Sequence, residues 1–223
     1  MDTDTLIGQL SKDAQPVRRL HSPLVRTLVW LAIGLLTVAA STAVLPLRAD
    51  LMAQLDDPRF VIEQASAMLT AATAAFAALT LVVPGRSRRW IFLPLVPVSI
   101  WLASIGWGCL QDISRAILGV VVFESDWSCF PAIALIGAVP ALAMVAMLRH
   151  GAPLMPGLVV ALGGLAAAAL GDFTLRLSHT IDSGLMVLIW QIGSVAILTA
   201  IAGWVGPSIL HWRHSRRQAA ARV

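Results

Sequence analysis

Six stretches of about 20 mostly apolar residues run through this chain of 223 residues, and only short polar segments separate them. A helix needs about 20 apolar residues to cross the hydrocarbon core of a bilayer. In lipid a spanning segment must also satisfy its own backbone hydrogen bonds, which a helix does. We therefore predict an all-α integral membrane protein, a six-helix transmembrane bundle. The predicted spans lie at about residues 25–45, 60–83, 90–110, 129–148, 154–175 and 184–210.

The composition restricts what such a chain can do. Charged residues make up 13% of it, against about 25% in soluble domains, and no segment outside the spans is long enough for a soluble catalytic domain. Walker, HExxH, GxSxG and paired CxxC motifs are missing from the sequence, so the pattern predicts neither an enzyme nor a cofactor. The net charge of +4 reflects topology and anionic lipid in a membrane protein, and does not indicate direct nucleic-acid binding.

Basic residues predict the orientation. If both termini are cytoplasmic, all but four of the 16 Lys and Arg residues fall on the inner side, where the positive-inside rule expects them. The four outer residues are Arg48, Arg59, Arg115 and Arg176. The prediction is a multi-pass protein of the bacterial inner membrane, with a cytosolic N-terminal segment at 1–24, a transmembrane domain at 25–210 and a basic cytosolic tail at 211–223.

Polar residues are few inside the spans. Glu63 and Asp172 both lie near the predicted outer surface, and Asp172 stands four residues before Arg176, the spacing of a helical ion pair. We assign them an interface or packing role. Transport would favour ionisable groups or broken helices near the midplane, so a small transporter or channel is an alternative, as is a structural membrane subunit.

Small residues recur on one face of the second and fifth spans. Such faces let helix backbones approach closely in lipid, either within the bundle or in a homodimer, and the sequence leaves both open. The residues are Ala67, Ala71, Ala74 and Ala78, and Gly157, Ala161, Gly164, Ala168 and Gly171.

The two cysteines, Cys109 and Cys129, lie at opposite ends of one predicted outer loop. Outer thiols can pair in an oxidising periplasm, and a disulfide here would contribute about 3 kcal/mol. Three interpretations stay open: a structural disulfide, a redox- or metal-responsive thiol pair, and two unpaired cysteines. His179, in the next outer loop, is a weak metal-binding candidate, and the sequence predicts no metal framework.

The N-terminal segment is predicted to form a short amphipathic helix. Leu6, Ile7 and Leu10 share one helical face, and Pro16 ends the helix. A helix this short is marginal alone in water, so its apolar face is expected to lie on the membrane, on the bundle or in a groove of a partner protein. Arg18 and Arg19 then tether the segment to anionic headgroups.

Several short motifs, in this order and spacing, resemble the NrsF family, the membrane-bound negative regulators of sigma-F. The resemblance covers essentially the whole chain, including the six spans. It is carried by residues 4–7 (DTLI), 16–20 (PVRRL), 57–60 (DPRF), 83–85 (VPG), 106–109 (GWGC), 149–153 (RHGAP) and 179–183.

The resemblance implies an anti-sigma factor. Such a protein holds an extracytoplasmic-function (ECF), sigma-F-like sigma factor at the inner membrane and releases it on envelope, metal or oxidative stress. Leu6, Ile7, Leu10, Arg18 and Arg19 would then contact the sigma factor, and the outer cysteines would report the signal. In this family a cysteine often follows the outer histidine, where this chain has Thr180, so Cys109 and Cys129 are the thiol pair that remains.

Overall fold

The computed structural model describes residues 2–12, 20–117, 128–179 and 184–220 of the chain. This part of the chain is helical and contains no strand. Its elements are α1 (Thr3–Lys12), α2 (Pro23–Val44), α3 (Leu51–Leu55), α4 (Pro58–Leu81), η1 (Arg88–Phe92), α5 (Leu95–Ile117), α6 (Cys129–Leu148), α7 (Pro156–Arg176), α8 (Gly184–Met186), η2 (Val187–Ile192) and α9 (Gly193–Ala220).

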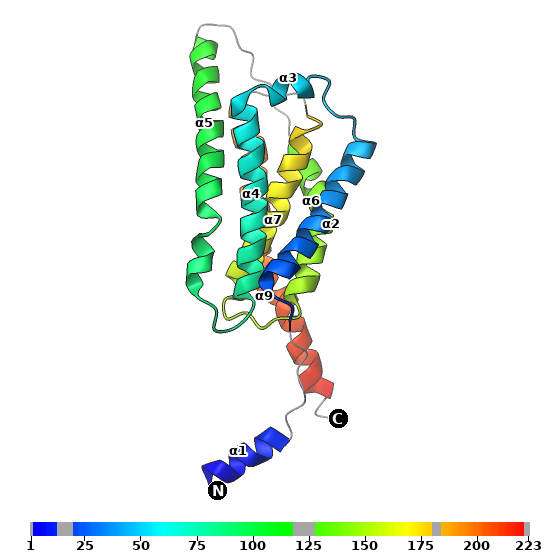
Figure 1. Cartoon of the computed structure of the whole chain (residues 1–223), viewed down its shortest axis with the longest axis vertical. Coiled ribbons are helices and arrows are strands. Elements are labelled where there is room, and N and C mark those ends of the chain that lie inside the picture. The colour runs from blue at the N-terminus through cyan, green and yellow to red at the C-terminus, as the bar shows by residue number, and fades with distance from the viewer. Residues whose placement is uncertain (1, 13–19, 118–127, 180–183, 221–223) are drawn as a thin grey trace.

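Six helical segments of the described chain are long and apolar enough to cross a membrane, as the sequence predicts. They run up and down in an elongated bundle, with both chain termini at one end (Figure 1). We call this the terminal end, which also holds the turns at 82–94 and 149–155. The opposite end, with α3 and the start of α4, is the distal end.

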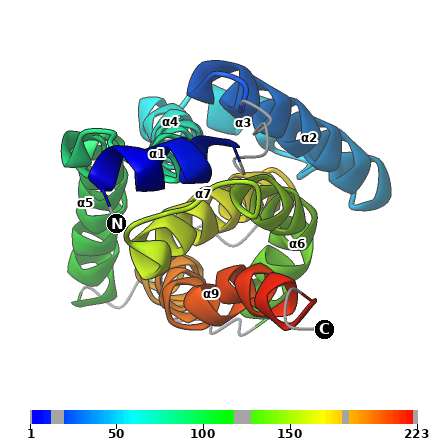
Figure 2. The same cartoon turned by 90° about the horizontal axis from the view of Figure 1, so that it is seen from below.

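The centre of the bundle is α7, which packs on α9, α4 and α6 (Figure 2). Its small residues permit this. A Cβ at Gly171 would lie 2.7 Å from the carbonyl oxygen of Ile133 on α6, and one at Gly164 would lie 2.5 Å from the Cβ of Ala202 on α9. The predicted alanine face of α4 is fully buried as well. The small-residue faces therefore pack helices within one chain, and the homodimer stays a prediction.

Local signals fix where the helices begin. The Ser22 side chain accepts from the Val25 amide before Pro23 starts α2, and Asp57 accepts from the Arg59 amide before Pro58 starts α4. Each pair combines a capping oxygen with a proline at the first helical position, where the missing N–H costs nothing.

Three boundaries differ from the prediction. The predicted span at 90–110 is divided near Pro94 into the 3₁₀ turn η1 and α5, and α5 continues to Ile117. The sixth span opens with the π-helix η2, and α9 continues through the predicted tail to Ala220. The apolar pattern ends at 110 and at 210. No glycine or proline lies between residues 110 and 117, so α5 continues there, whereas α9 continues past Gly206 and Pro207, two residues that often end a helix.

Candidate functional site

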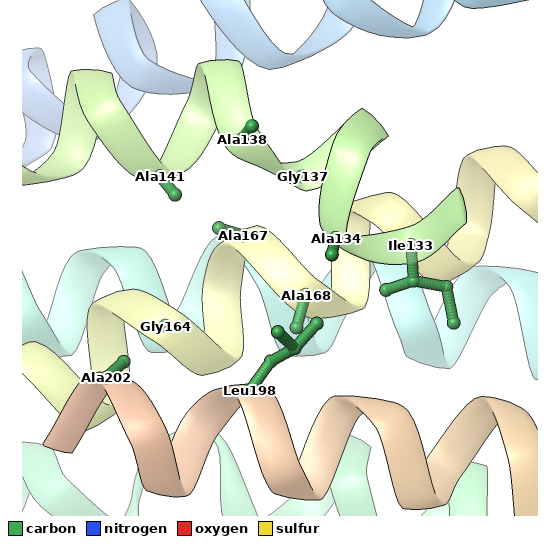
Figure 3. A pocket seen from close by; sticks show the side chains of 10 residues that line it. All are labelled: Ile133, Ala134, Gly137, Ala138, Ala141, Gly164, Ala167, Ala168, Leu198 and Ala202. Atoms are coloured by element: carbon green, nitrogen blue, oxygen red, sulfur yellow. The ribbon is translucent and has the colours of Figure 1, made fainter. Parts of the chain in front are cut away.

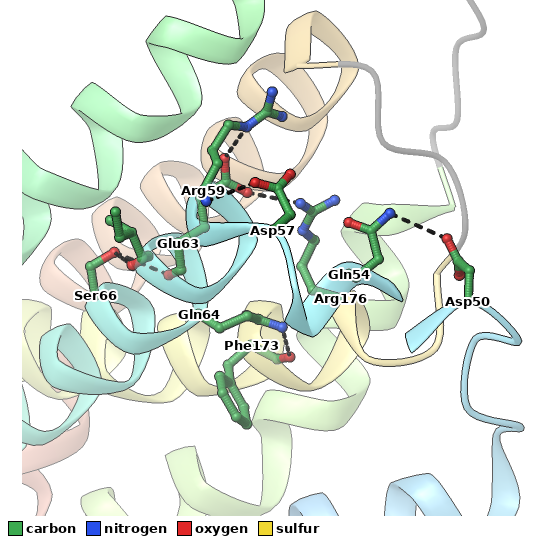
Figure 4. Close-up of polar contacts among 10 residues, drawn as sticks. Asp50, Gln54, Asp57, Arg59, Glu63, Gln64, Ser66, Phe173 and Arg176 are labelled. Atoms are coloured by element: carbon green, nitrogen blue, oxygen red, sulfur yellow. Dashed lines mark hydrogen bonds and ion pairs between the residues drawn. The ribbon is translucent and has the colours of Figure 1, made fainter. Parts of the chain in front are cut away.

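A charge cluster at the distal end surrounds Glu63, which is 3% exposed. Its Oε1 accepts from Arg59 Nε at 2.9 Å, one turn earlier on α4, and its Oε2 accepts from Arg176 Nη2 at 2.8 Å, at the end of α7 (Figure 4). One buried carboxylate thus pairs with two guanidinium groups from two helices.

Arg48 extends the cluster towards α2. Its Nε and Nη2 donate to the two carboxylate oxygens of Asp50 at 2.7 and 2.8 Å, and its backbone amide donates to the carbonyl of Leu177 at 3.0 Å. The hydrogen bonds from Arg48 hold the pKa of the Asp50 carboxyl well below its usual range. The guanidinium groups of Arg48 and Arg176 lie 5.6 and 5.5 Å from the ring centroid of Phe60, within range of cation–π attraction.

Arg176, which the sequence places four residues after Asp172, forms an ion pair with a carboxylate on another helix. The described Arg176 guanidinium reaches across to Glu63, and Oδ1 of Asp172 is buried without a hydrogen-bond partner. Helical spacing favours the local pair by only a few tenths of a kcal/mol, whereas Glu63 offers a buried carboxylate that already faces α7. The i,i+4 pair that does form is Arg59–Glu63, and its spacing was visible in the sequence.

Cys109 lies beside this cluster on α5. A Cβ at the neighbouring Gly108 would lie 2.5 Å from Cζ of Arg59, so the guanidinium packs directly on the α5 backbone. Cys109 is 7% exposed and carries a thiol.

Cys129, at the start of α6, is 1% exposed and is also a thiol, so no disulfide joins the two described cysteines. Its Sγ lies 3.9 Å from Nε2 of His179, the residue that the sequence singled out in the following loop. The structure thus brings together two predicted residues that are 50 positions apart. Their sensing roles stay predictions.

Each cysteine is one residue or one contact removed from a segment that carries the distal cluster. Cys109 adjoins Gly108, on which Arg59 packs, and Arg59 pairs with Glu63. On the other side, Arg176 pairs with Glu63 and stands three residues before His179. Contacts therefore connect Gly108 to Arg176 through Arg59 and Glu63, and the chain itself connects Arg176 to His179.

Metal-ligating groups do not otherwise gather in the described residues, where no cluster of three or more His, Cys, Asp or Glu side chains occurs. The Cys129–His179 pair supplies two donors of the kind that zinc and softer cations prefer.

Three of the five predicted partner-binding residues lie in a described helix at the terminal end (Figure 1). Leu6, Ile7 and Leu10 all belong to α1, and Ile7 is 58% exposed. The side chains of Leu6 and Leu10 and the whole of Arg18 and Arg19 lie outside the described residues. Their role in partner binding stays a prediction.

Sequence reasoning missed Arg26, near the start of α2. This residue is 7% exposed, and its Nη1 and Nη2 donate to the carbonyls of Leu79 on α4 and Met147 on α6, at 3.3 and 2.7 Å. Both carbonyls belong to last turns, which leave their oxygens without helical partners. From the sequence, an arginine at the edge of the first span is expected to contact lipid headgroups. The fold shows instead that Arg26 faces the interior of the bundle.

Comparison with known proteins gives one match. The family model of the negative regulators of sigma F, NrsF, matches residues 10–212. No curated protein and no solved structure matches the chain.

Proposed function

The chain belongs to the NrsF family of negative regulators of sigma F, and from this premise we propose that it holds an ECF sigma factor at the bacterial inner membrane. The family match over nearly the whole chain carries the proposal, since it makes a sigma factor the partner. The chain has few places to meet one. In a bilayer the six long helices would be lipid-embedded, which leaves α1, the short terminal turns and the end of α9.

Charge supports a cytoplasmic terminal end. The described arginines Arg86, Arg88, Arg89 and Arg149 are exposed in its turns, as the positive-inside rule expects of cytoplasmic loops. At the distal end Arg48, Arg59 and Arg176 are each ion-paired.

The helix α1 is the proposed contact with the sigma factor. It presents the exposed Ile7, and Leu6 and Leu10 fall on the same side of an ideal helix. A stripe of this kind suits the helix-in-groove mode of binding, in which apolar anchors at helical spacing enter a hydrophobic groove.

Removal of this helix provides the test. The full chain and a chain lacking residues 1–22 are used to pull down the cognate sigma factor from detergent extracts. We expect the full chain to retain the sigma factor and the shortened chain to lose it. Retention by the shortened chain would exclude α1 as the binding element, and loss from both would refute the proposed function.

A paired substitution sharpens this prediction. Leu6→Glu with Leu10→Glu places two charges on the apolar face and should derepress the sigma-dependent reporter to the level of a deletion strain. Thr5→Glu, on the opposite face of the same helix, should leave repression unchanged. Equal repression by both variants would count against the groove model.

The signal is proposed to enter at the distal end, where modification or metal binding at the Cys129–His179 pair would shift helix packing. A ligand can do this only if it binds two arrangements of the bundle with different affinity. The contacts through Arg176, Glu63 and Arg59 provide a route from this pair to α4 and α5.

We expect Cys129→Ser and His179→Ala each to weaken induction by a thiol-binding cation, because each removes one of two adjacent donors. Induction is measured as reporter activity against cadmium concentration, with basal repression as the control for folding. Full induction in both variants would exclude this pair as the sensor, and Cys109→Ser tests the other thiol independently.

A further inference from the structure

An apolar groove runs along the bundle between α5, α7 and α9. It has a volume of about 400 Å³. Trp101 and Val195 lie at its buried side, Leu165 is half-buried, and Leu102, Ala196 and Ala200 form its exposed rim. A second pocket, between α6, α7 and α9, holds only about 120 Å³ and is walled mainly by alanine and glycine (Figure 3).

The length of the larger groove matches one lipid chain. Along η2 and α9 its lining runs from Ile192 to Gly203, which at 1.5 Å per residue is about 16 Å. Half of a hydrocarbon core that is about 30 Å thick has the same depth.

Positive charge lies on η1, which directly precedes α5 at the terminal end. Arg88 and Arg89 are exposed on η1, and Val98, which lines the groove, follows in the first turn of α5. Between Glu63 and Asp112 the sequence contains no acidic residue. Trp90 holds η1 against α4 through an edge contact with Phe76, at a centroid distance of 5.3 Å, and marks the headgroup level where tryptophan gathers.

From this combination we infer that the groove binds one chain of an anionic phospholipid whose phosphate lies at Arg88 and Arg89. The apolar lining takes the acyl chain, and the two arginines select the charge of the headgroup. The inference rests on the proposed placement in a bilayer but not on sigma-factor binding. Lipid binding can therefore fail while sigma-factor binding holds, and the reverse.

Native mass spectrometry of the full chain released from detergent tests it. The protein is titrated with phosphatidylglycerol and with phosphatidylcholine carrying the same acyl chains. Basic side chains near an anionic lipid surface each contribute severalfold, so one phosphatidylglycerol per chain should be retained about tenfold more tightly. Arg88→Gln with Arg89→Gln should remove this preference, and Arg149→Gln, at the same end, should keep it.

The groove itself is tested by filling it. Ala200→Phe, on the exposed rim, should weaken binding of both lipids, whereas Leu36→Phe, on the exposed face of α2, should leave both unchanged. Equal retention of the two lipids by the unaltered chain would overturn the inference. So would unchanged binding in Ala200→Phe, or a dimer mass that disappears in that variant, which would assign the groove to a second copy.

Discussion

Glu63→Gln is expected to destabilise the bundle by about 3–5 kcal/mol, the cost of removing one partner from a buried ion pair. The glutamine leaves Arg59 and Arg176 with a neutral amide in place of the carboxylate that joins them. In a chain of this size the midpoint of thermal unfolding, Tm, should fall by roughly 6 °C or more. Fluorescence-monitored melting in detergent measures the shift.

Asp172→Asn is the matched control, because Asp172 is a buried carboxylate at the same end of the bundle. Its Oδ1 has no hydrogen-bond partner, so removing this carboxylate should lower Tm by much less than removing that of Glu63, or raise it. Adding Arg176→Gln to Glu63→Gln should recover part of the loss, because one uncompensated charge disappears. Equal losses in Glu63→Gln and Asp172→Asn would show that the cluster does not act as a paired unit.

Arg26→Met is expected to destabilise the terminal end by about 3 kcal/mol, since two hydrogen bonds from a charged donor are lost and their acceptors stay poorly solvated. The Arg26 guanidinium donates to the carbonyl oxygens of Leu79 and Met147. The long apolar side chain of methionine preserves most of the packing volume.

The same melting experiment includes Arg149→Gln, an exposed arginine at the same end, which should change Tm by less than about 1 °C because isolated surface charges contribute little. Under the proposed function, Arg26→Met should also weaken repression, because α2 directly follows the segment that carries α1. A variant as stable as the unaltered chain would mean that water satisfies both carbonyls.

Local signals in the sequence predicted much of the fold. The span at 129–148 coincides with α6, and the proline and acidic residues at 57–58 begin α4 where expected. These features depend on neighbouring residues alone. The extension of α5 and α9 was not predictable from hydropathy, because hydropathy marks where a segment enters lipid and a helix can continue beyond that point into polar sequence.

The candidate site was less predictable, since it depends on which helix faces which. The Arg176–Glu63 pair joins residues 113 positions apart, and the Cys129–His179 contact joins residues 50 apart. Sequence analysis singled out all four residues, but it expected the partner of Arg176 to lie on the same helix. Sequence spacing gives the direction of a side chain around its helix, but not the neighbour that the bundle places there.

The continuity of α9 sets a spacing for any assembly at the terminal end. Gly206 is its last residue packed tightly on α7, and the helix continues to Ala220. Fourteen further residues at 1.5 Å each make a rod of roughly 20 Å, comparable to the radius of a small folded domain. Under the proposed function, a sigma factor held by α1 would therefore share the terminal end with this rod (Figure 1).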